Sequence, residues 1–473
     1  MCRGNVVRIL YVALAMAALL IGPGAANAAP QQSPSAPSGD VGKFNGAGSC
    51  AASSCHGSVK PKDTTCVGTS ATSKCIWQNE FSIWAAQDKH ARAYSVLSNP
   101  VSLRMGKMLQ PPIEQPNKSE KCLACHALYV PENVRATTFK LDDGVSCENC
   151  HGPAAGWLGY HTTKDWQYDT AVNKLGMYDT RDLVKRTEQC LTCHVGTADK
   201  QVDHEMIAAG HPDLTFELDS FSAAMPRHWK TNRDNNTPWF GAQNWAVGQA
   251  VQLNKSLQRV SRRALSGNWP EYSELDCFAC HHSLTAPADS WRLTTTDYYQ
   301  GRRAGVPAWN DSRYVVFRYF ADVVDPKTAE QMEKQLDNLS LLFAKWASPK
   351  EISASALTAA STVDQLGQKI RTQRYDPDLV ARIMLRIASN GTTIADSGER
   401  AAEQATMALD SLFLAYTANA KVGNETELRA AINKLFQQLQ PNPSAYNAVQ
   451  FKDQLKRVQA LLPHSSQGPV GGQ

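Results

Sequence analysis

Residues 147–151 read Cys147-Glu-Asn-Cys150-His151. This stretch has two cysteines three positions apart and a histidine directly after the second, and one helical turn places the three side chains on the same side. Two thiols in this arrangement can bond to the vinyl groups of a haem while the imidazole reaches its iron. The same spacing recurs in Cys122-Leu-Ala-Cys125-His126, Cys190-Leu-Thr-Cys193-His194 and Cys277-Phe-Ala-Cys280-His281. These segments predict covalent attachment of c-type haem.

A fifth segment, Cys50-Ala-Ala-Ser-Ser-Cys55-His56, has four residues between its cysteines and keeps the histidine directly after the second. We predict that it also holds haem, which makes five covalently bound haem c groups, each with its iron. Paired cysteines also occur in zinc sites and disulfides, but zinc spacing does not demand a histidine after every second cysteine. The predicted proximal iron ligands are His56, His126, His151, His194 and His281.

Each haem iron has a sixth position, and further histidines lie in the same part of the chain. They are His90, His161, His204, His211, His228 and His282. We expect the first five to be distal ligands, whereas His282 directly follows a proximal ligand and could reach only a neighbouring haem. A methionine such as Met206 is the alternative distal ligand. The tryptophans near the motifs are expected to pack against porphyrin faces; they include Trp84, Trp157, Trp229 and Trp245.

The N-terminus has the parts of a secretory signal peptide, namely two arginines, an apolar stretch over residues 9–21 and small residues up to Ala28. We predict a signal peptide over residues 1–28 and a periplasmic or otherwise exported mature protein. An uncleaved anchor is the alternative, although this stretch is short for a membrane span. In an oxidising compartment Cys66 and Cys75, which no histidine follows, are expected to form a disulfide bond.

Composition divides the rest of the chain. Residues 29–45 are rich in Ala, Pro, Gln and Ser and are predicted to be a disordered leader. Residues 46–318 contain all the haem motifs, with abundant Gly and Pro and little periodicity. They predict a pentahaem cytochrome c domain that is mainly α with much irregular structure, wrapped around stacked haems. Residues 325–465 have helical periodicity and predict a separate bundle of about five or six helices.

Capping residues support the predicted bundle. Asp325 and Asp376 each precede a proline, which is the arrangement of an N-cap followed by Pro at the first helical position. The pair Asn390-Gly391 is expected to end the second of these helices. Asn424 with Glu427 resembles a capping box at the start of another helix.

A family resemblance rests on the order of several segments. These are Trp84 with His90-Ala91-x-Ala93, then the motifs that end at His126, at His151 (followed by Gly152-Pro153 and His161) and at His194. Over roughly residues 46–195 this order resembles the cytochrome c-554 family of multihaem cytochromes. The resemblance implies a mostly helical, loop-rich chain around closely stacked haems, with His90 and His161 as distal ligands. It also implies that, if one haem has an open sixth position, it is the haem of His126.

Members of that family are electron carriers associated with nitrogen-compound oxidation. The chain departs from their tetrahaem pattern in its long first loop, the insertion around Cys66 and Cys75, the fifth motif and the C-terminal helices. The segment from His204 to Trp229 is similar to larger multihaem cytochromes of undefined function.

These observations favour an electron carrier that transfers electrons between other redox proteins and has no catalytic residues of its own. The alternative is an oxidoreductase that acts on a small nitrogen or sulfur compound at one open-faced haem, although no attachment motif has the lysine that marks the catalytic haem of one reductase family. The C-terminal helical domain is expected to provide a docking surface. The net charge is +4 and the basic residues do not cluster, so we expect no nucleic-acid partner. No later segment has the roughly 20 apolar residues of a stable membrane span.

Overall fold

The computed structural model describes residues 41–62, 77–229, 237–267, 269–277, 280–281, 308–439 and 446–463. The predicted signal peptide, most of the predicted leader, Cys66, Cys75 and His282 lie outside the described residues. Within these ranges the chain is mainly helical, and its β-structure consists of isolated bridges between Phe44 and Arg135 and between Leu275 and Trp309. The predicted fold class, mainly α with much irregular structure, is confirmed.

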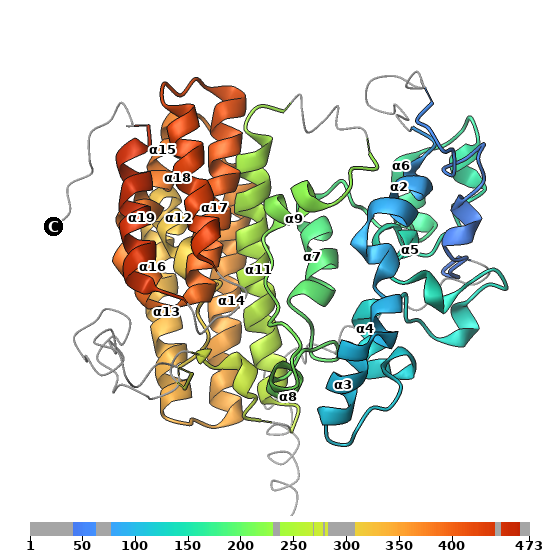
Figure 1. The fold of residues 1–473 in the computed structure, drawn as a ribbon, viewed down its shortest axis with the longest axis horizontal. Coiled ribbons are helices and arrows are strands. Elements are labelled where there is room, and N and C mark those ends of the chain that lie inside the picture. Colours follow the sequence, from blue (N-terminus) through green and yellow to red (C-terminus); the bar gives the residue numbers. More distant parts are fainter. Residues whose placement is uncertain are drawn as a thin grey trace, which may run out of the picture.

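The part of the chain before residue 230 consists of short helices joined by irregular segments (Figure 1, right). Its α-helices are α2 (Glu80–Gln87), α3 (Pro100–Met108), α4 (Glu120–His126), α5 (Cys147–His151), α6 (Tyr168–Lys174), α7 (Leu183–His194), α8 (His204–Ala208) and α9 (Leu218–Ala224). Between them lie the 3-10 helices η1 (Ala47–Cys50), η2 (Lys89–Arg92), η3 (Ser95–Ser98), η4 (Pro116–Lys118), η5 (Glu132–Val134), η6 (Leu141–Asp143) and η7 (Tyr160–Thr162). The longest helix in this group, α7, has 12 residues, so these elements cannot form a core of packed long helices.

The last residues of the predicted leader belong to the fold. The backbone N–H of Phe44 donates to the carbonyl of Val134 at 2.8 Å, and the N–H of Ala136 donates to the carbonyl of Phe44 at 2.9 Å. The N–H of Asn45 donates to the carboxylate of Glu148 at 2.9 Å. Long-range hydrogen bonds that composition does not reveal therefore hold Phe44 and Asn45, at the end of the predicted leader, in place.

The second part of the chain forms a helical bundle (Figure 1, left). After α11 (Phe240–Ala264) and η8 (Tyr272–Glu274) come α12 (Val315–Val324), α13 (Pro326–Ala344), α14 (Pro349–Thr372), α15 (Pro377–Ser389), α16 (Gly391–Asp396), α17 (Glu399–Asn419), α18 (Glu425–Gln438) and α19 (Ala448–Leu461). Seven of these helices follow residue 325 in the described part of the chain, more than the five or six expected.

Two of the three predicted caps are confirmed. Asp325 accepts a hydrogen bond from the N–H of Thr328 at 3.2 Å, and Asp376 accepts one from the N–H of Leu379 at 2.8 Å. The third prediction is wrong, because the side chain of Asn424 makes no cap bond to α18 and its amide instead donates to the carbonyl of Leu461 at 2.9 Å. A tertiary contact with α19 thus replaces the local one.

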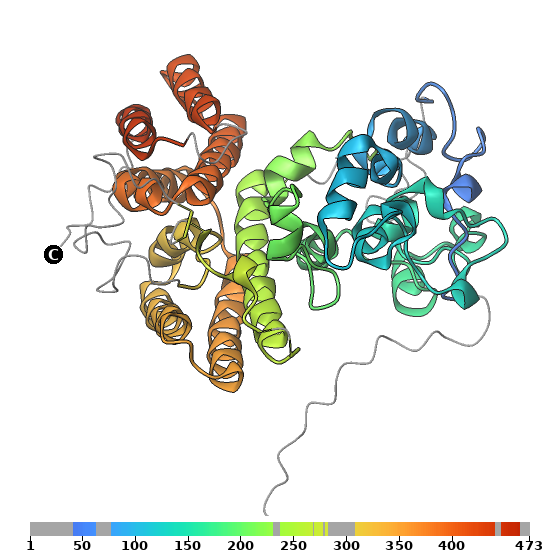
Figure 2. The same cartoon turned by 60° about the horizontal axis from the view of Figure 1, so that its bottom comes forward.

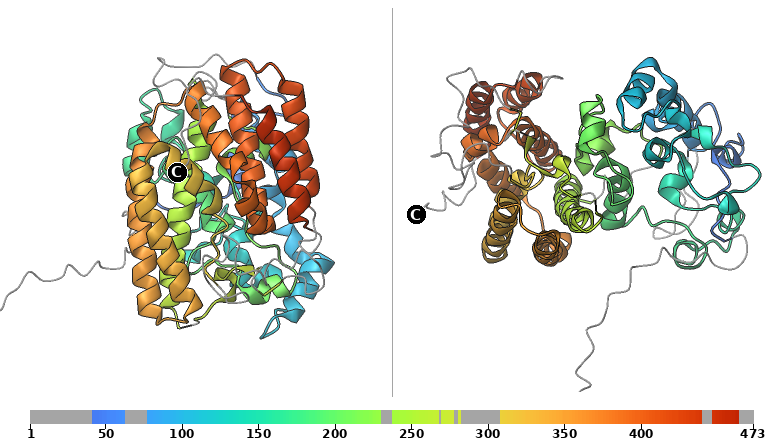
Figure 3. Two further views of the ribbon diagram at one scale, coloured as in Figure 1. Left: turned by 90° about the vertical axis from the view of Figure 1, so that its left-hand side faces the viewer. Right: turned by 90° about the horizontal axis from the view of Figure 1, so that it is seen from below.

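Helix α11 lies at the centre of the molecule. It is 25 residues long and is buried on almost all sides. On one side it packs most extensively against α14 and also contacts α12 and α17, and on the other side it packs against α7 and α9 (Figures 2 and 3). Gly248 allows the close approach of α9, because a Cβ atom at this position would lie 2.6 Å from the Cβ atom of Leu218.

Trp245 shows what α11 contributes to the core. Its ring is fully buried and packs edge-on against Phe320 of α12, with ring centres 5.1 Å apart. The expectation that Trp245 packs against a porphyrin is therefore wrong, because its side of α11 faces the bundle.

The buried side chains of α7, α9, α11 and the C-terminal helices form one continuous hydrophobic cluster. Helix α11 lies within the residues assigned from sequence to the haem domain, 46–318, yet it is covered by α14 from the predicted helical domain, 325–465. We therefore propose that the structural boundary lies before α11 and that the C-terminal bundle includes this helix.

Candidate haem-binding sites

The attachment motifs occupy helical turns. Helices α4, α5 and α7 each end at the histidine of a Cys-x-x-Cys-His motif. We number the five motifs in the order in which they occur along the chain, so the first contains Cys50 and the fifth contains Cys277. In the fifth motif the N–H groups of Cys280 and His281 donate to the carbonyl of Cys277 at 3.2 and 2.7 Å, which is the bonding of a single turn. In the first motif Cys50 ends η1, and the N–H of Cys55 closes the longer loop by donating to the carbonyl of Ala52 at 2.8 Å. Four of the five motifs therefore lie on a helical turn, as predicted from their spacing, and the first lies on a longer closed loop.

Helix α5 shows why such a short helix is defined by its sequence. Ser146 and Asn149 form a reciprocal capping box, in which Asn149 accepts from the N–H of Ser146 at 2.7 Å. The helix ends at Gly152, which has φ 78°, and a Cβ atom there would lie 2.4 Å from the carbonyl oxygen of Gly176. His151 is consequently the last helical residue.

Each motif histidine lies near one of the five predicted distal histidines. The distances between ring centres are 6.2 Å for His56 and His161, 6.2 Å for His194 and His90, 6.4 Å for His126 and His211, and 6.2 Å for His281 and His204. The remaining two, His151 and His228, are close enough for the charge of His228 to contribute to the lowered pKa of His151, although burial is the larger cause.

These distances fit a metal ion between two imidazoles. A bond between a metal ion and an imidazole nitrogen is about 2 Å long, and that nitrogen lies about 1.1 Å from its ring centre, so rings on opposite sides of one metal have centres about 6 Å apart. That the ten imidazoles bind haem iron stays a prediction.

Hydrogen bonds orient six of these imidazoles through Nδ1. The Nδ1 atoms of His56 and His90 lie 2.9 Å from a Glu80 carboxylate oxygen and 3.0 Å from an Asp88 carboxylate oxygen. The other four Nδ1 atoms lie against backbone carbonyls: His126 against Ala93 at 2.9 Å, His211 against Pro212 at 2.8 Å, His228 against Pro226 at 3.3 Å, and His161 against Leu158. An Nδ1–H that donates to such an acceptor leaves Nε2 free to bind a metal.

The surroundings also set the charge of the rings. Burial lowers the pKa of His151 and of His194 to about 4, so these rings are neutral at pH 7, which is the form that binds a metal. The hydrogen bonds to Glu80 and Asp88 instead raise the pKa values of His56 and His90. The pairs His56–His161 and His194–His90 therefore differ from the other three in that one histidine of each lies against a carboxylate.

Contacts between cysteines show which attachment sites are neighbours. The nearby thiol of Cys147 lowers the pKa of Cys50, and the nearby thiol of Cys125 lowers the pKa of Cys193, so the two thiols of each pair lie close together. The first motif therefore lies beside the third, and the second beside the fourth. The nearby Cys190 contributes to the pKa of Cys150, which burial raises to about 12, so the third and fourth motifs are also close.

Aromatic rings cover several of the imidazoles. Trp157 lies 5.6 Å from His161 and Trp229 lies 5.0 Å from His228, between ring centres. Phe216 and Phe221 lie 5.4 and 5.2 Å from His194. Trp84 donates from its indole nitrogen to the carbonyl of Val145 at 3.0 Å. The rings of Trp157, Trp229, Phe216 and Phe221 therefore pack against three of the imidazoles, those of His161, His228 and His194.

Sequence reasoning listed the ten histidines but missed the residues that orient them. Asp88 lies two positions before His90 and also accepts from the backbone N–H of that residue at 2.9 Å. This short spacing could have predicted that Asp88 orients the ring of His90. Glu80 lies 24 positions after His56, and no spacing rule relates a carboxylate to a ligand at that distance.

Comparison with known proteins agrees with the geometry. The sequence model of one protein family, described as cytochrome c554 and c-prime, matches residues 71–152, a range that includes the second and third motifs. Neither the curated proteins nor the solved structures gave a match to this chain. No helix in the described part of the chain is long and apolar enough to cross a membrane. The chain is therefore a c-type cytochrome involved in electron transfer, and it resembles the cytochrome c554 and c-prime family.

Proposed function

We propose that this protein is an exported pentahaem cytochrome that transfers electrons between redox partner proteins and has no open haem for a substrate. The observation that carries the proposal is that all five motif histidines have a second histidine nearby, with ring centres 6.2 to 6.4 Å apart in four of the five pairs. With two imidazoles on each iron, a substrate would have to displace a protein ligand.

Each haem would be held by two cysteines and two histidines. The cysteines are Cys50 and Cys55, Cys122 and Cys125, Cys147 and Cys150, Cys190 and Cys193, and Cys277 and Cys280. The haem supplies the one-electron redox chemistry. The chain orients the imidazoles through their Nδ1 hydrogen bonds and packs aromatic rings against several of them.

The contacts between motifs support an order for the electron path. The thiol contacts and the proximity of Cys150 to Cys190 suggest the order first, third, fourth, second. The ammonium group of Lys121, next to Cys122, lies 2.7 Å from the carboxylate of Asp203, next to His204. His204 faces His281, so the fifth haem would follow the second. Partners would then dock near the first and fifth motifs, with the C-terminal bundle as a further docking surface.

The alternative function is an oxidoreductase with one open haem, which the family resemblance would place at His126. The ring of His211 lies 6.4 Å from that of His126 and its Nδ1 is held by the carbonyl of Pro212, which supports a sixth ligand at this haem. The carrier is therefore the better supported function.

The haem number is tested by mass. Intact mass after acid-acetone extraction should equal the mature chain plus five haems, and the variant Cys50→Ala/Cys55→Ala should contain one haem fewer. Four haems in the wild type would mean that no haem is attached at the longer first motif.

N-terminal sequencing of the exported protein tests cleavage after Ala28.

Carbon monoxide tests the absence of an open haem, since it binds reduced haem only where the sixth position is open or weakly held. We expect no Soret shift for the reduced wild type. His211→Ala is the positive control, because it should open the haem of His126 and give a shift worth about one haem in five. A shift of that size in the wild type would overturn the carrier proposal in favour of the oxidoreductase.

A further inference from the structure

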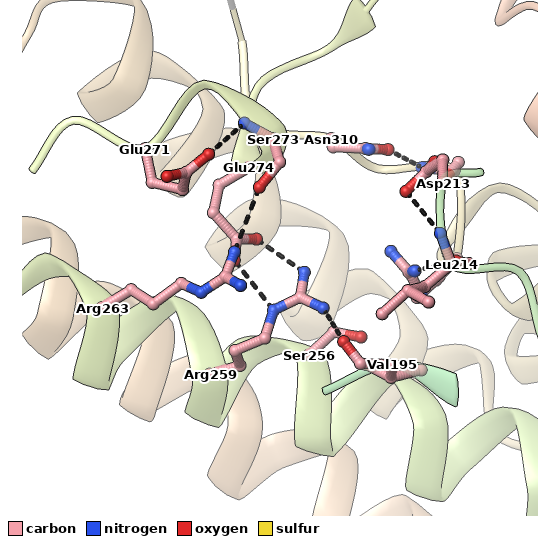
Figure 4. A network of polar contacts seen from close by, with 12 residues as sticks. Val195, Asp213, Leu214, Ser256, Arg259, Arg263, Glu271, Ser273, Glu274 and Asn310 are labelled. Atoms are coloured by element: carbon pink, nitrogen blue, oxygen red, sulfur yellow. Dashed lines mark hydrogen bonds and ion pairs between the residues drawn. The ribbon is translucent and has the colours of Figure 1, made fainter. Parts of the chain in front are cut away.

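A cluster of buried arginines lies between α11 and the segment that leads into the fifth motif. Arg259 binds the carboxylate of Glu274 through two nitrogens, each at 2.8 Å, and Arg263 binds it at 2.6 Å (Figure 4). The two arginines are 6% and 4% exposed, and Glu274 is 1% exposed. Both arginines therefore share one carboxylate as their buried counter-ion.

Arg313 belongs to the same cluster but has no such counter-ion. Its side chain is 7% exposed, and it donates one hydrogen bond to the carbonyl of Leu214 at 2.5 Å. Its Nε–H has no hydrogen-bond partner, and no carboxylate of the described residues lies at ion-pair distance from it. The carboxylate of the neighbouring Asp213 lies 3.5 Å from the guanidinium of Arg400 and accepts from the N–H of Leu214 at 2.7 Å, so it is paired with Arg400 and not with Arg313.

A buried guanidinium without a counter-ion is costly, because a charge removed from water needs a partner in the low-dielectric interior. The planar guanidinium with free N–H donors matches a carboxylate in shape and charge. Among the described residues Arg313 therefore lacks a counter-ion, and the carboxylate of a bound group is an anion of the kind that would pair with it.

The cluster adjoins three of the haem sites. Leu214, the acceptor of Arg313, lies three positions after His211, and Glu274 lies three positions before Cys277. The guanidinium of Arg259 donates to the carbonyl of Val195, the residue after His194. The backbone N–H of Asn310 donates to the carbonyl of Glu274 at 2.9 Å, which ties the Arg313 segment to the fifth motif.

We propose that Arg313 binds a haem propionate and thereby sets the reduction potential of that haem. This inference rests on the proposed function, since it requires the haems. The propionate would belong either to the haem attached at Cys277 and Cys280 or to the haem between His126 and His211. Both haems would provide the same carboxylate chemistry. These two sites are considered because Arg313 contacts Leu214 near His211 and its segment is bonded to Glu274 near Cys277, whereas the His194 site is contacted by Arg259.

The test is a spectroelectrochemical titration of Arg313→Gln in the full-length holoprotein. Loss of the cation leaves the propionate charge uncompensated, which favours the oxidised haem. We expect the reduction equilibrium of one haem to weaken about tenfold, equivalent to a midpoint about 59 mV lower for one electron. Arg263→Gln is the matched control, because Arg263 is also buried but is paired with Glu274; it should shift the potentials much less. Unchanged midpoints in Arg313→Gln, or an equal shift in both variants, would overturn the proposal.

Haem counting keeps this result separate from the proposed function. A wild type with other than five haems contradicts the proposed function, whereas Arg313→Gln with five haems and wild-type potentials contradicts only the role of Arg313. The source of the propionate follows from adding Arg313→Gln to Cys277→Ala/Cys280→Ala. A shift that persists assigns it to the haem of His126, and one that disappears assigns it to the fifth haem.

Arg313→Gln could fail to fold, so the wild type provides a second test. An experimental structure of the holoprotein should place a propionate oxygen about 2.7 to 2.9 Å from a guanidinium nitrogen of Arg313. If those nitrogens contact only protein groups or water, the proposal is wrong.

Discussion

Replacing Glu80 by glutamine should raise the midpoint potential of the first haem. The Glu80 carboxylate lies 2.9 Å from Nδ1 of His56, the predicted proximal ligand of the first haem. Burial raises the pKa of Glu80, but the hydrogen bonds from His56 and from the backbone outweigh it, so the net pKa lies below the ordinary value and the group stays ionised at pH 7. Glutamine retains an oxygen that can accept from Nδ1–H, so Glu80→Gln removes mainly the charge.

The magnitude follows from Coulomb's law. A carboxylate and a metal ion on opposite sides of one imidazole ring are about 7 Å apart, and one charge unit at this distance is worth about 2.4 kcal/mol at an effective dielectric constant of about 20. A potential of 100 mV corresponds to about 2.3 kcal/mol per electron, so complete loss would shift the midpoint by about 100 mV. The Glu80 and His56 side chains are 14% and 25% exposed, and solvent screening reduces the effect. We expect a rise of about 50 to 100 mV.

The assay is a redox titration followed by visible spectroscopy, with haem content checked by mass. Glu330→Gln is the control, because Glu330 is a fully exposed carboxylate on α13 that pairs with Lys334. It should leave all potentials unchanged. If Glu80→Gln has five haems and wild-type potentials, or if a potential falls, the proposed effect of Glu80 on the haem bound by His56 is refuted.

Three further predictions concern the fold. Burial, with the nearby Asp219, raises the pKa of Glu217 from 4.5 to about 7. The folded state therefore binds more protons than the unfolded state in this window, and stability should fall by up to about 3 kcal/mol as pH rises from 4.5 to 7. Urea unfolding of Glu217→Gln at pH 5 and pH 8 should lack this decrease, and an unchanged slope contradicts it. Trp245→Ala should lower the free energy of unfolding by about 3 to 5 kcal/mol and leave the haem spectrum unchanged; an altered haem spectrum would connect this ring to a haem after all. A chain that ends at Arg318 should aggregate because it exposes the α14-facing side of α11, and a soluble truncated protein with five haems would show that the bundle is a separate unit.

The sequence alone predicted the features that depend on neighbouring residues. The cysteines and histidine of each motif act within one helical turn, so their spacing is enough to predict the helical ends of α4, α5 and α7. The caps at Asp325 and Asp376 are local in the same sense, since each bonds an N–H three positions later. The cap expected at Asn424 failed because its amide found a partner 37 positions away.

Which distant groups come into contact became clear from the three-dimensional structure. His90 lies near His194, 104 positions later, and Glu80 reaches back to His56, and neither pairing has a spacing rule. The same holds for α11, which is close in sequence to the haem motifs but packs with helices more than 80 positions away. Local spacing is constrained by the geometry of the helix, so a short sequence pattern predicts it. The long-range contacts depend on how the irregular segments fold in three dimensions, and no short sequence pattern predicts them.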